Sequence, residues 1–246
     1  MIAGPEILAA AAGYLAGSIP FALLVVRLFG RGEPLRKIEL TAPGAKGGAL
    51  RSSAVSATAV RLQLGARYGC LTGILDMAKA AAVTLVFKVA FPGETHFLIA
   101  SGMAVVGHIW PIFHRFRGGR GQSSAIGGLF VVDWPVPLIA YPLSLILGLA
   151  ARARGYVDRF APMVIAAGWL YFRFEDLSFV YYALGICLVR NIAMRYEIKQ
   201  YVQLRKAGAL RTLSDELKFL GLDTATSRAM AGLRQLWTSL KRRRGS

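Results

Sequence analysis

The residues best suited to chemistry lie in one short stretch, 107–124, which contains two histidines, three arginines and four glycines. The guanidinium groups supply fixed positive charge, because they stay protonated at neutral pH. Glycines let the backbone adopt positive φ, and successive N–H groups before a helix start can hold an anion. We call residues 117–121 the glycine turn. The pattern predicts a phosphate-type site made from Arg117, Arg120 and the backbone of Gly118, Gly119 and Gly121.

Two residues flank this turn. His108 precedes it within an apolar segment, and Ser123 follows it at the start of another. A histidine there either packs between helices or orients or deprotonates an oxygen of a substrate. Arginines after a span also serve as membrane anchors, in which case the glycines only form a turn. The spacing by itself leaves both interpretations open.

The composition indicates a membrane protein. Of 246 residues 55% are hydrophobic, and the net charge is +17. Such a basic chain often binds nucleic acid. Here the charges are separated from long apolar runs, with a mean hydropathy of +0.47. We therefore expect no nucleic-acid partner, and instead a basic face toward anionic membrane lipids and anionic substrates.

Neither a metal site nor an organic cofactor is expected. The two cysteines, Cys70 and Cys187, lie in or beside apolar segments and have no CxxC-type spacing. No GxSxG or comparable pairing of nucleophile and base occurs. Any reaction is therefore expected to proceed without a covalent enzyme intermediate.

The apolar segments predict an all-α polytopic membrane protein with about seven transmembrane helices. A helix needs about 20 residues to cross about 30 Å of hydrocarbon, so several of these segments are short or broken. The first is interrupted at residues 17–20, where carbonyls freed by Pro20 need partners from neighbouring helices. The segments are 7–26, 69–91, 97–113, 123–132, 138–151, 160–173 and 179–194.

The positive charges predict the orientation. With the N-terminus outside, 27 of the 30 Lys and Arg residues fall in inner loops or the C-terminal part, and three outer loops contain none. The positive-inside rule therefore favours N-out, C-in. Within a span, Asp76 and Lys79 stand at i, i+3 spacing, which indicates a structural ion pair rather than a substrate contact. Ser18 is expected to form an interhelical hydrogen bond.

We expect a transmembrane domain at 1–195 and a basic, partly helical cytoplasmic tail at 196–246. Thr212 and Asp215 resemble a capping box. The tail is interpreted as a short solvated helix with a frayed end. The alternative is a membrane-surface anchor, in which Trp237 and the basic run 241–244 contact an anionic leaflet.

Several motifs in order resemble a known family. They are Gly17-Ser-Ile-Pro-Phe21, Leu35-Arg-Lys37, Leu75-Asp76 with Lys79, and Gly107-His-Ile-x-Pro-x-Phe113 with Phe116-Arg-Gly-Gly-Arg-Gly121. Over about residues 10–205 the chain resembles the acyl-phosphate-dependent glycerol-3-phosphate acyltransferases, the PlsY family of bacterial membrane enzymes. The resemblance implies a multi-pass protein of the bacterial inner (plasma) membrane with its active site facing the cytoplasm.

The resemblance also implies a reaction and its residues. An acyl chain would move from acyl phosphate to the sn-1 hydroxyl of glycerol 3-phosphate, giving lysophosphatidate for phospholipid synthesis. His108 and Arg120 would be catalytic. The substrate-binding residues would be Arg36, Ser52, Thr58, Arg117, Gly118, Gly119, Gly121, Ser123, Arg195 and Glu197.

The chain departs from the family at defined positions. The motif Ser-Gly-Asn-x-Gly-x-Thr-Asn aligns with residues 52–59, where Ser52 and Thr58 are kept but Ala54 and Ala59 replace both asparagines. Arg-Gly-Gly-Arg-Gly stands for Lys-Gly-Gly-Lys-Gly, and residues 195–197 match Arg-Glu-Asn only loosely. An alternative is therefore an inactive or substrate-shifted relative that binds lipid phosphate or a membrane partner. A small transporter is a third interpretation, which the crowding of polar residues toward the inner side disfavours.

Overall fold

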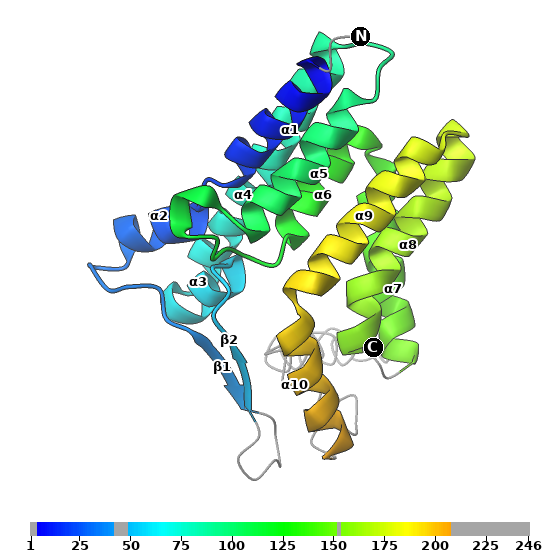
Figure 1. The fold of residues 1–246 in the computed structure, drawn as a ribbon. Coiled ribbons are helices and arrows are strands. Elements are labelled where there is room, and N and C mark those ends of the chain that lie inside the picture. The colour runs from blue at the N-terminus through cyan, green and yellow to red at the C-terminus, as the bar shows by residue number, and fades with distance from the viewer. Residues whose placement is uncertain (1–3, 42–48, 152–153, 208–246) are drawn as a thin grey trace, which may run out of the picture. The chain divides into compact units, whose positions relative to one another are not determined.

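A computed structural model describes residues 4–41, 49–151 and 154–207, and α-helices dominate it (Figure 1). The α-helices are α1 (Gly4–Gly17), α2 (Phe21–Phe29), α3 (Ala57–Leu64), α4 (Ala66–Ala90), α5 (His96–Ile109), α6 (Gln122–Val132), α7 (Pro135–Ala150), α8 (Arg154–Phe174), α9 (Leu177–Ala193) and α10 (Arg195–Lys206). A 3-10 turn, η1, spans Ile112–His114, and two strands, β1 (Ile38–Thr41) and β2 (Ala49–Ser52), pair with each other.

Every apolar segment expected from the sequence lies largely in a helix, so the helical class is confirmed. The β1–β2 pair is the exception to an all-α fold. Each strand has four residues, too few for the sequence to show a clear two-residue alternation. The tail features expected at Thr212, Asp215, Trp237 and 241–244 lie outside the described residues.

Three helical segments in the described part of the chain are long and apolar enough to cross a membrane: Gly4–Phe29, Ala66–Ala90 and His96–His114. A fourth is added if α9 and α10, which meet at a bend of 68°, form one broken span. The helices α6 and α7 are apolar but shorter. The count of seven spans and the N-out orientation remain predictions.

The described residues divide into two compact units. One comprises 4–38, 51–151 and 154–198, and contains α1 to α9 with every residue of the candidate site. The other comprises 39–41, 49–50 and 199–207. The first unit ends three residues beyond the predicted domain boundary at 195, which itself remains a prediction.

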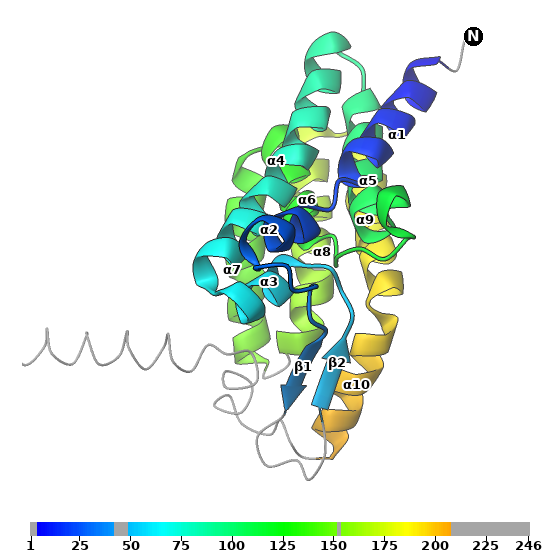
Figure 2. The same ribbon diagram turned by 90° about the vertical axis from the view of Figure 1, so that its left-hand side faces the viewer.

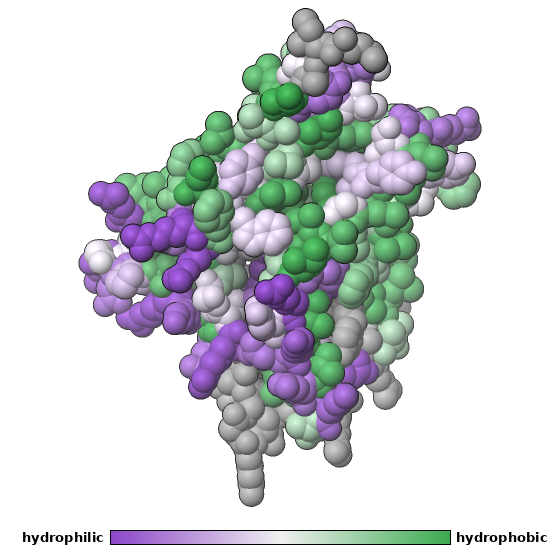
Figure 3. All heavy atoms as spheres, viewed as in Figure 1, coloured by the Kyte–Doolittle hydropathy of each residue, from purple (hydrophilic) through white to green (hydrophobic). Residues whose placement is uncertain are grey.

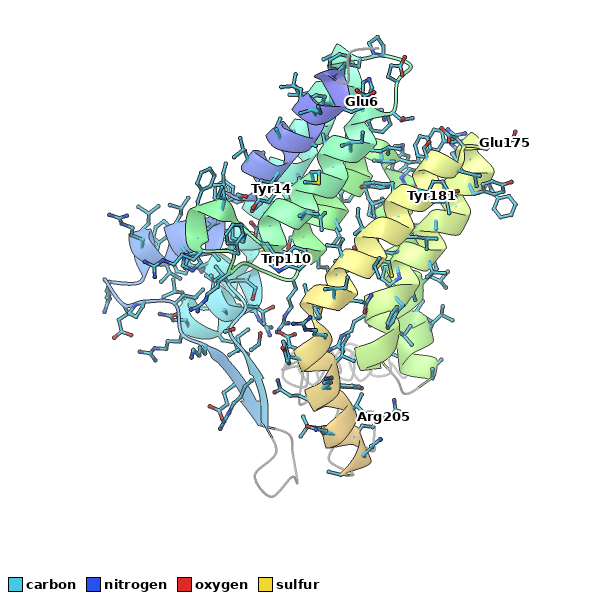
Figure 4. All side chains as sticks on the ribbon, viewed as in Figure 1. Glu6, Tyr14, Trp110, Glu175, Tyr181 and Arg205 are labelled. Atoms are coloured by element: carbon cyan, nitrogen blue, oxygen red, sulfur yellow. The ribbon has the colours of Figure 1, made fainter. Side chains whose placement is uncertain are left out.

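Close contact between α1 and α5 fixes the start of the site. The two helices lie side by side in both ribbon views (Figures 1 and 2). A Cβ on Gly107 would lie 2.2 Å from the Tyr14 carbonyl oxygen, so only glycine permits this approach. The Tyr14 hydroxyl donates to the Trp110 carbonyl at 2.9 Å (Figure 4), and Ser18 Oγ accepts from Ile112 N at 3.4 Å. The expected hydrogen bond of Ser18 to another helical segment is thereby confirmed.

The surface of the first unit is that of a membrane protein. Hydrophobic side chains cover much of the visible faces of its helices, and hydrophilic ones gather over α2 and the segment after it (Figure 3). Several large apolar side chains are well exposed, including Phe172 at 83% and Leu28 at 74%. Exposed apolar surface on this scale is unfavourable in water and favourable against lipid.

Candidate active site

The glycine turn is held against the C-terminal end of α5. Pro111 follows the helix, and Arg115 and Phe116 adopt positive φ of 51° and 57°, which reverse the chain. Gly119 N donates to the His108 carbonyl at 3.0 Å, and Val55 N donates to the Gly118 carbonyl at 2.9 Å. The turn is therefore fixed from two sides, by the end of α5 and by the segment before α3.

A pocket of about 380 Å³ opens beside this turn. Three separate parts of the first unit form it: the end of β2 and the following residues, the turn after α5, and the α9–α10 junction. Six of the twelve predicted site residues line it, namely Ser52, Arg117, Gly118, Gly119, Arg120 and Glu197. The structure thus brings together residues up to 145 positions apart in the chain.

An ion pair crosses the pocket. Arg120 Nε lies 3.0 Å from Glu197 Oε2, and Ser52 Oγ forms a hydrogen bond with Glu197 Oε1. The Arg120 side chain is 25% exposed, so it still faces the pocket. A guanidinium has five N–H donors, and Arg120 contacts Glu197 through Nε. The Glu197 carboxylate therefore occupies one side of a cation that can also bind a phosphate group.

His108 belongs to a second, buried group behind the turn. Its Nδ1 lies 3.4 Å from Asp76 Oδ1, and Lys79 Nζ lies 2.8 Å from the same oxygen. Lys79 Nζ also donates to the Ile19 carbonyl at 2.7 Å. The predicted Asp76–Lys79 ion pair is confirmed, and the lysine contacts a carbonyl at the interruption of the first helix, as that interruption required. The contact with His108 was not predicted.

His108 is placed where its side chain can support the glycine turn. It does not line the main pocket; together with Asp76 and Lys79 it borders a small cavity of about 10 Å³, enough for about one water molecule. The point where a Gly119 Cβ would lie is 2.1 Å from His108 Nε2. Because Asp76 faces Nδ1, the carboxylate orients the ring and directs Nε2 at the turn.

The other predicted site residues lie outside the pocket. Arg36 is 69% exposed and pairs with Glu33, and Arg195 is exposed with its guanidinium 4.9 Å from the Tyr196 ring. Gly121, at φ 74°, caps α6 and is buried. Thr58 and Ser123 are half-buried on α3 and α6. These residues can support the pocket only indirectly in this arrangement.

Other pocket residues were missed from the sequence. Arg51, Ser53 and Trp110 line it, although none was predicted to do so. Arg51 and Ser53 flank a predicted residue, and Trp110 lies within the stretch 107–124, so nearness in sequence was an available signal for all three. Within the described ranges, no group of three or more His, Cys, Asp or Glu side chains is arranged to hold a metal ion.

The buried Asp76 group gives a stability prediction. In Asp76→Asn the side chain keeps its size, but Lys79 and His108 lose the carboxylate that they face. Breaking a buried ion pair typically costs about 3–5 kcal/mol, because the remaining charge is left without a partner. We expect a loss of this order, measured by thermal or denaturant unfolding of the purified protein in detergent. Asp76→Asn with Lys79→Met should recover much of it; equal losses in the single and double variants would contradict this account.

The fold and the pocket define a class: a polytopic membrane protein whose arginine-rich and glycine-rich turn borders a pocket lined by Arg51, Arg117 and Arg120. The particular family follows from comparison. The chain belongs to the glycerol-3-phosphate acyltransferase family, whose sequence model matches residues 7–204.

Individual members of this family are similar to the chain in sequence or in structure. The glycerol-3-phosphate acyltransferase of Maricaulis maris is 38% identical over 163 residues, covering 63% of this chain and 68% of the relative. That of Rhodospirillum rubrum is 36% identical over 143 residues, covering 58% and 63%. The crystal structure of PlsY, an integral membrane glycerol 3-phosphate acyltransferase, in its glycerol 3-phosphate form aligns with a TM-score of 0.66 at 25% identity, covering 82% of this chain and 94% of that one. The lysophosphatidic acid form gives 0.65 at 24% identity, with the same coverage.

Proposed function

We propose that this protein transfers an acyl chain from acyl phosphate to the sn-1 hydroxyl of glycerol 3-phosphate. The supporting observation is the pocket that joins Arg117, Arg120 and the glycine turn, in a chain of the glycerol-3-phosphate acyltransferase family. Both substrates carry a phosphate group, and arginine and backbone N–H groups bind phosphate.

The chemistry needs positioning more than covalent catalysis. The acceptor hydroxyl oxygen attacks the acyl carbonyl carbon, the bond from that carbon to the phosphate oxygen breaks, and phosphate leaves with the electron pair. The hydroxyl proton passes to the departing phosphate, so the products are the ester and hydrogen phosphate. Because acyl phosphate is already activated, the protein has to align the hydroxyl and stabilise the charge that develops. Arg117 and Arg120 hold phosphate, Ser52 and Glu197 lie beside Arg120, and His108 positions the turn.

The acyl chain is assigned to an apolar groove between α5 and α9. This groove of about 490 Å³ is lined by Thr95, which precedes α5, by residues of α5 between 98 and 106, and by residues of α9 between 178 and 189. The pocket begins one turn further along the same helices, at Ile109 and Ala193. An acyl chain in the groove would therefore place its carboxyl end beside Arg120.

The groove gives a specificity prediction. Gly185 lines it, and a Cβ built there meets no atom within 4 Å. Gly185→Trp would fill the groove with a large ring, so we expect at least a 10-fold lower kcat/KM for palmitoyl phosphate and little change for a donor of eight carbons. Gly168→Trp is the matched control, since that position on α8 also has open space. Unchanged chain-length preference in Gly185→Trp would place the acyl chain elsewhere.

The site is proposed to face the cytoplasm from a bacterial inner membrane. The pocket residues come from 51–54, 109–120 and 193–197. They lie in or next to segments whose arginines and lysines favour the inner side, where anionic lipids attract basic residues. Cysteine-labelling from either side of spheroplasts tests this orientation.

The function is tested with purified protein, labelled glycerol 3-phosphate and palmitoyl phosphate. Labelled lysophosphatidate is expected from palmitoyl phosphate, and none from palmitoyl-coenzyme A. A panel of other phosphate-bearing alcohols tests the acceptor, because Ala54 lines the pocket where the family has asparagine. Failure to form product with every acceptor would contradict the proposal and leave a phosphate-binding relative.

A further inference from the structure

A further arginine, Arg190, lies behind the glycine turn and does not line the pocket. Arg190 of α9 is 2% exposed and is among the largest fully buried side chains of the described residues. Throughout the parts of the chain that the structure describes, no Asp or Glu forms an ion pair with it. A buried charge without a carboxylate partner is costly, so its presence calls for a reason other than stability.

The guanidinium of Arg190 contacts the two residues that flank Gly121, the residue that caps α6. Its Nε donates to the Arg120 carbonyl at 3.4 Å, and its Nη2 donates to Gln122 Oε1 at 3.3 Å. Gly121 lies between these two residues and begins α6 with φ 74°. One side chain from α9 therefore holds the backbone from which the Arg120 side chain extends into the pocket.

Two polar atoms next to these contacts have no hydrogen-bond partner. They are Arg190 Nη1 and the Tyr141 hydroxyl of α7, both buried, and the charge of Arg190 acts on that hydroxyl. A satisfied structural arginine would use its remaining donors. The contacts of Arg190 are directed at the turn, while its positive charge is left without a counter-ion.

The positive charges around Arg190 also destabilise the folded protein when no anion is bound. The N-terminus of α6 is the positive end of a helix dipole, where an anion is favourable and a cation is not. Arg190 adds a cation there, close to Arg120. An anion bound in the adjacent pocket would reduce the repulsion among these groups, and both substrates of the proposed reaction carry one.

We propose that Arg190 is a positioning residue for phosphate binding. It holds the Arg120 carbonyl and the Gln122 side chain on either side of Gly121, and adds positive potential behind the pocket, without touching the substrate. This inference rests on the proposed function in that phosphate is the ligand of the glycine turn. It does not require that the acceptor be glycerol 3-phosphate.

Arg190→Met removes the charge and keeps an unbranched apolar side chain, and Arg190→Lys keeps the charge but loses the planar fork of donors. For Arg190→Met we expect at least a 10-fold increase in KM for acyl phosphate and an equal increase in the Kd of inorganic phosphate, with kcat changed less. The thermal unfolding midpoint should stay level or rise, because an unpaired buried charge is removed. Arg190→Lys should give an intermediate KM. Arg173→Met, at an exposed position of α8, is the control.

Two results would overturn the proposal. One is an unchanged KM and phosphate Kd in both Arg190 variants. The other is a loss of activity that follows a fall in the unfolding midpoint, with phosphate Kd unchanged in the folded fraction, since that indicates a merely structural role. Phosphate binding is measured by calorimetry on the full chain in detergent, independently of turnover. Phosphate binding that weakens in Arg190→Met would therefore support this inference even if no acyl transfer were detected in the wild-type protein.

Discussion

Replacing Arg120 with alanine is expected to lower kcat/KM for acyl transfer by at least 100-fold while the protein remains folded and inserted. Removing one donor that stabilises developing charge typically costs about 10²–10³ in rate. The pocket makes the effect larger here. Glu197 would stay in the pocket, facing Ser52 but without its cation, and would repel the phosphate of either substrate.

A second substitution can separate the repulsion by Glu197 from the loss of the Arg120 guanidinium. Arg120→Ala with Glu197→Gln should regain part of the activity, because the unpaired carboxylate is then gone. Arg120→Lys should keep more activity than Arg120→Ala, because the family has lysine at this point of the motif. Arg67→Ala removes the same charge from an exposed position that does not line the pocket, and should behave like the wild type. Normal turnover by Arg120→Ala would refute the assignment of the site.

The helices were predictable because their cause is local. Runs of apolar residues and the breaks at Pro20 and Pro111 define them without reference to the rest of the fold. The glycine turn was predictable for the same reason, since Arg117 to Gly121 are neighbours in sequence. The β1–β2 pair was not, because strands of four residues depend on each other rather than on a pattern within either.

The parts of the site that were not predicted from the sequence depend on contacts between segments far apart in the chain. Asp76 and His108 are 32 positions apart and meet only because α4 packs against α5. Arg190 and Arg120 are 70 positions apart, and they meet because α9 packs against α5, the helix that precedes the glycine turn. Sequence spacing cannot show such pairs. The structure brings Ser52 and Glu197, which the family resemblance suggested, into one pocket. The resemblance also suggested Arg36 and Arg195, whose side chains the structure leaves exposed.

Gly118→Ala is expected to be the other strongly damaging substitution, with at least a 100-fold lower kcat/KM. A Cβ at this position would lie 2.1 Å from the His108 carbonyl oxygen and 2.6 Å from that of Ile109. Both are backbone atoms at the end of α5, so they cannot rotate away, and the turn itself must move. A displacement of about 1 Å is enough to lower a rate by about 10²-fold when groups are held for reaction. Assays of acyl transfer and of phosphate binding should both show the loss.

Gly119→Ala offers a matched comparison, because its new Cβ would meet a side chain instead. The nearest atom is His108 Nε2 at 2.1 Å, and the ring can rotate if it gives up its contact with Asp76. We therefore expect a smaller loss than for Gly118→Ala, and partial recovery when His108→Ala is added to make room. Gly168→Ala, where a Cβ meets no atom within 4 Å, should leave transfer unchanged. If Gly118→Ala and Gly168→Ala were equally active, the close contact between the turn and the end of α5 would not be what positions Arg120.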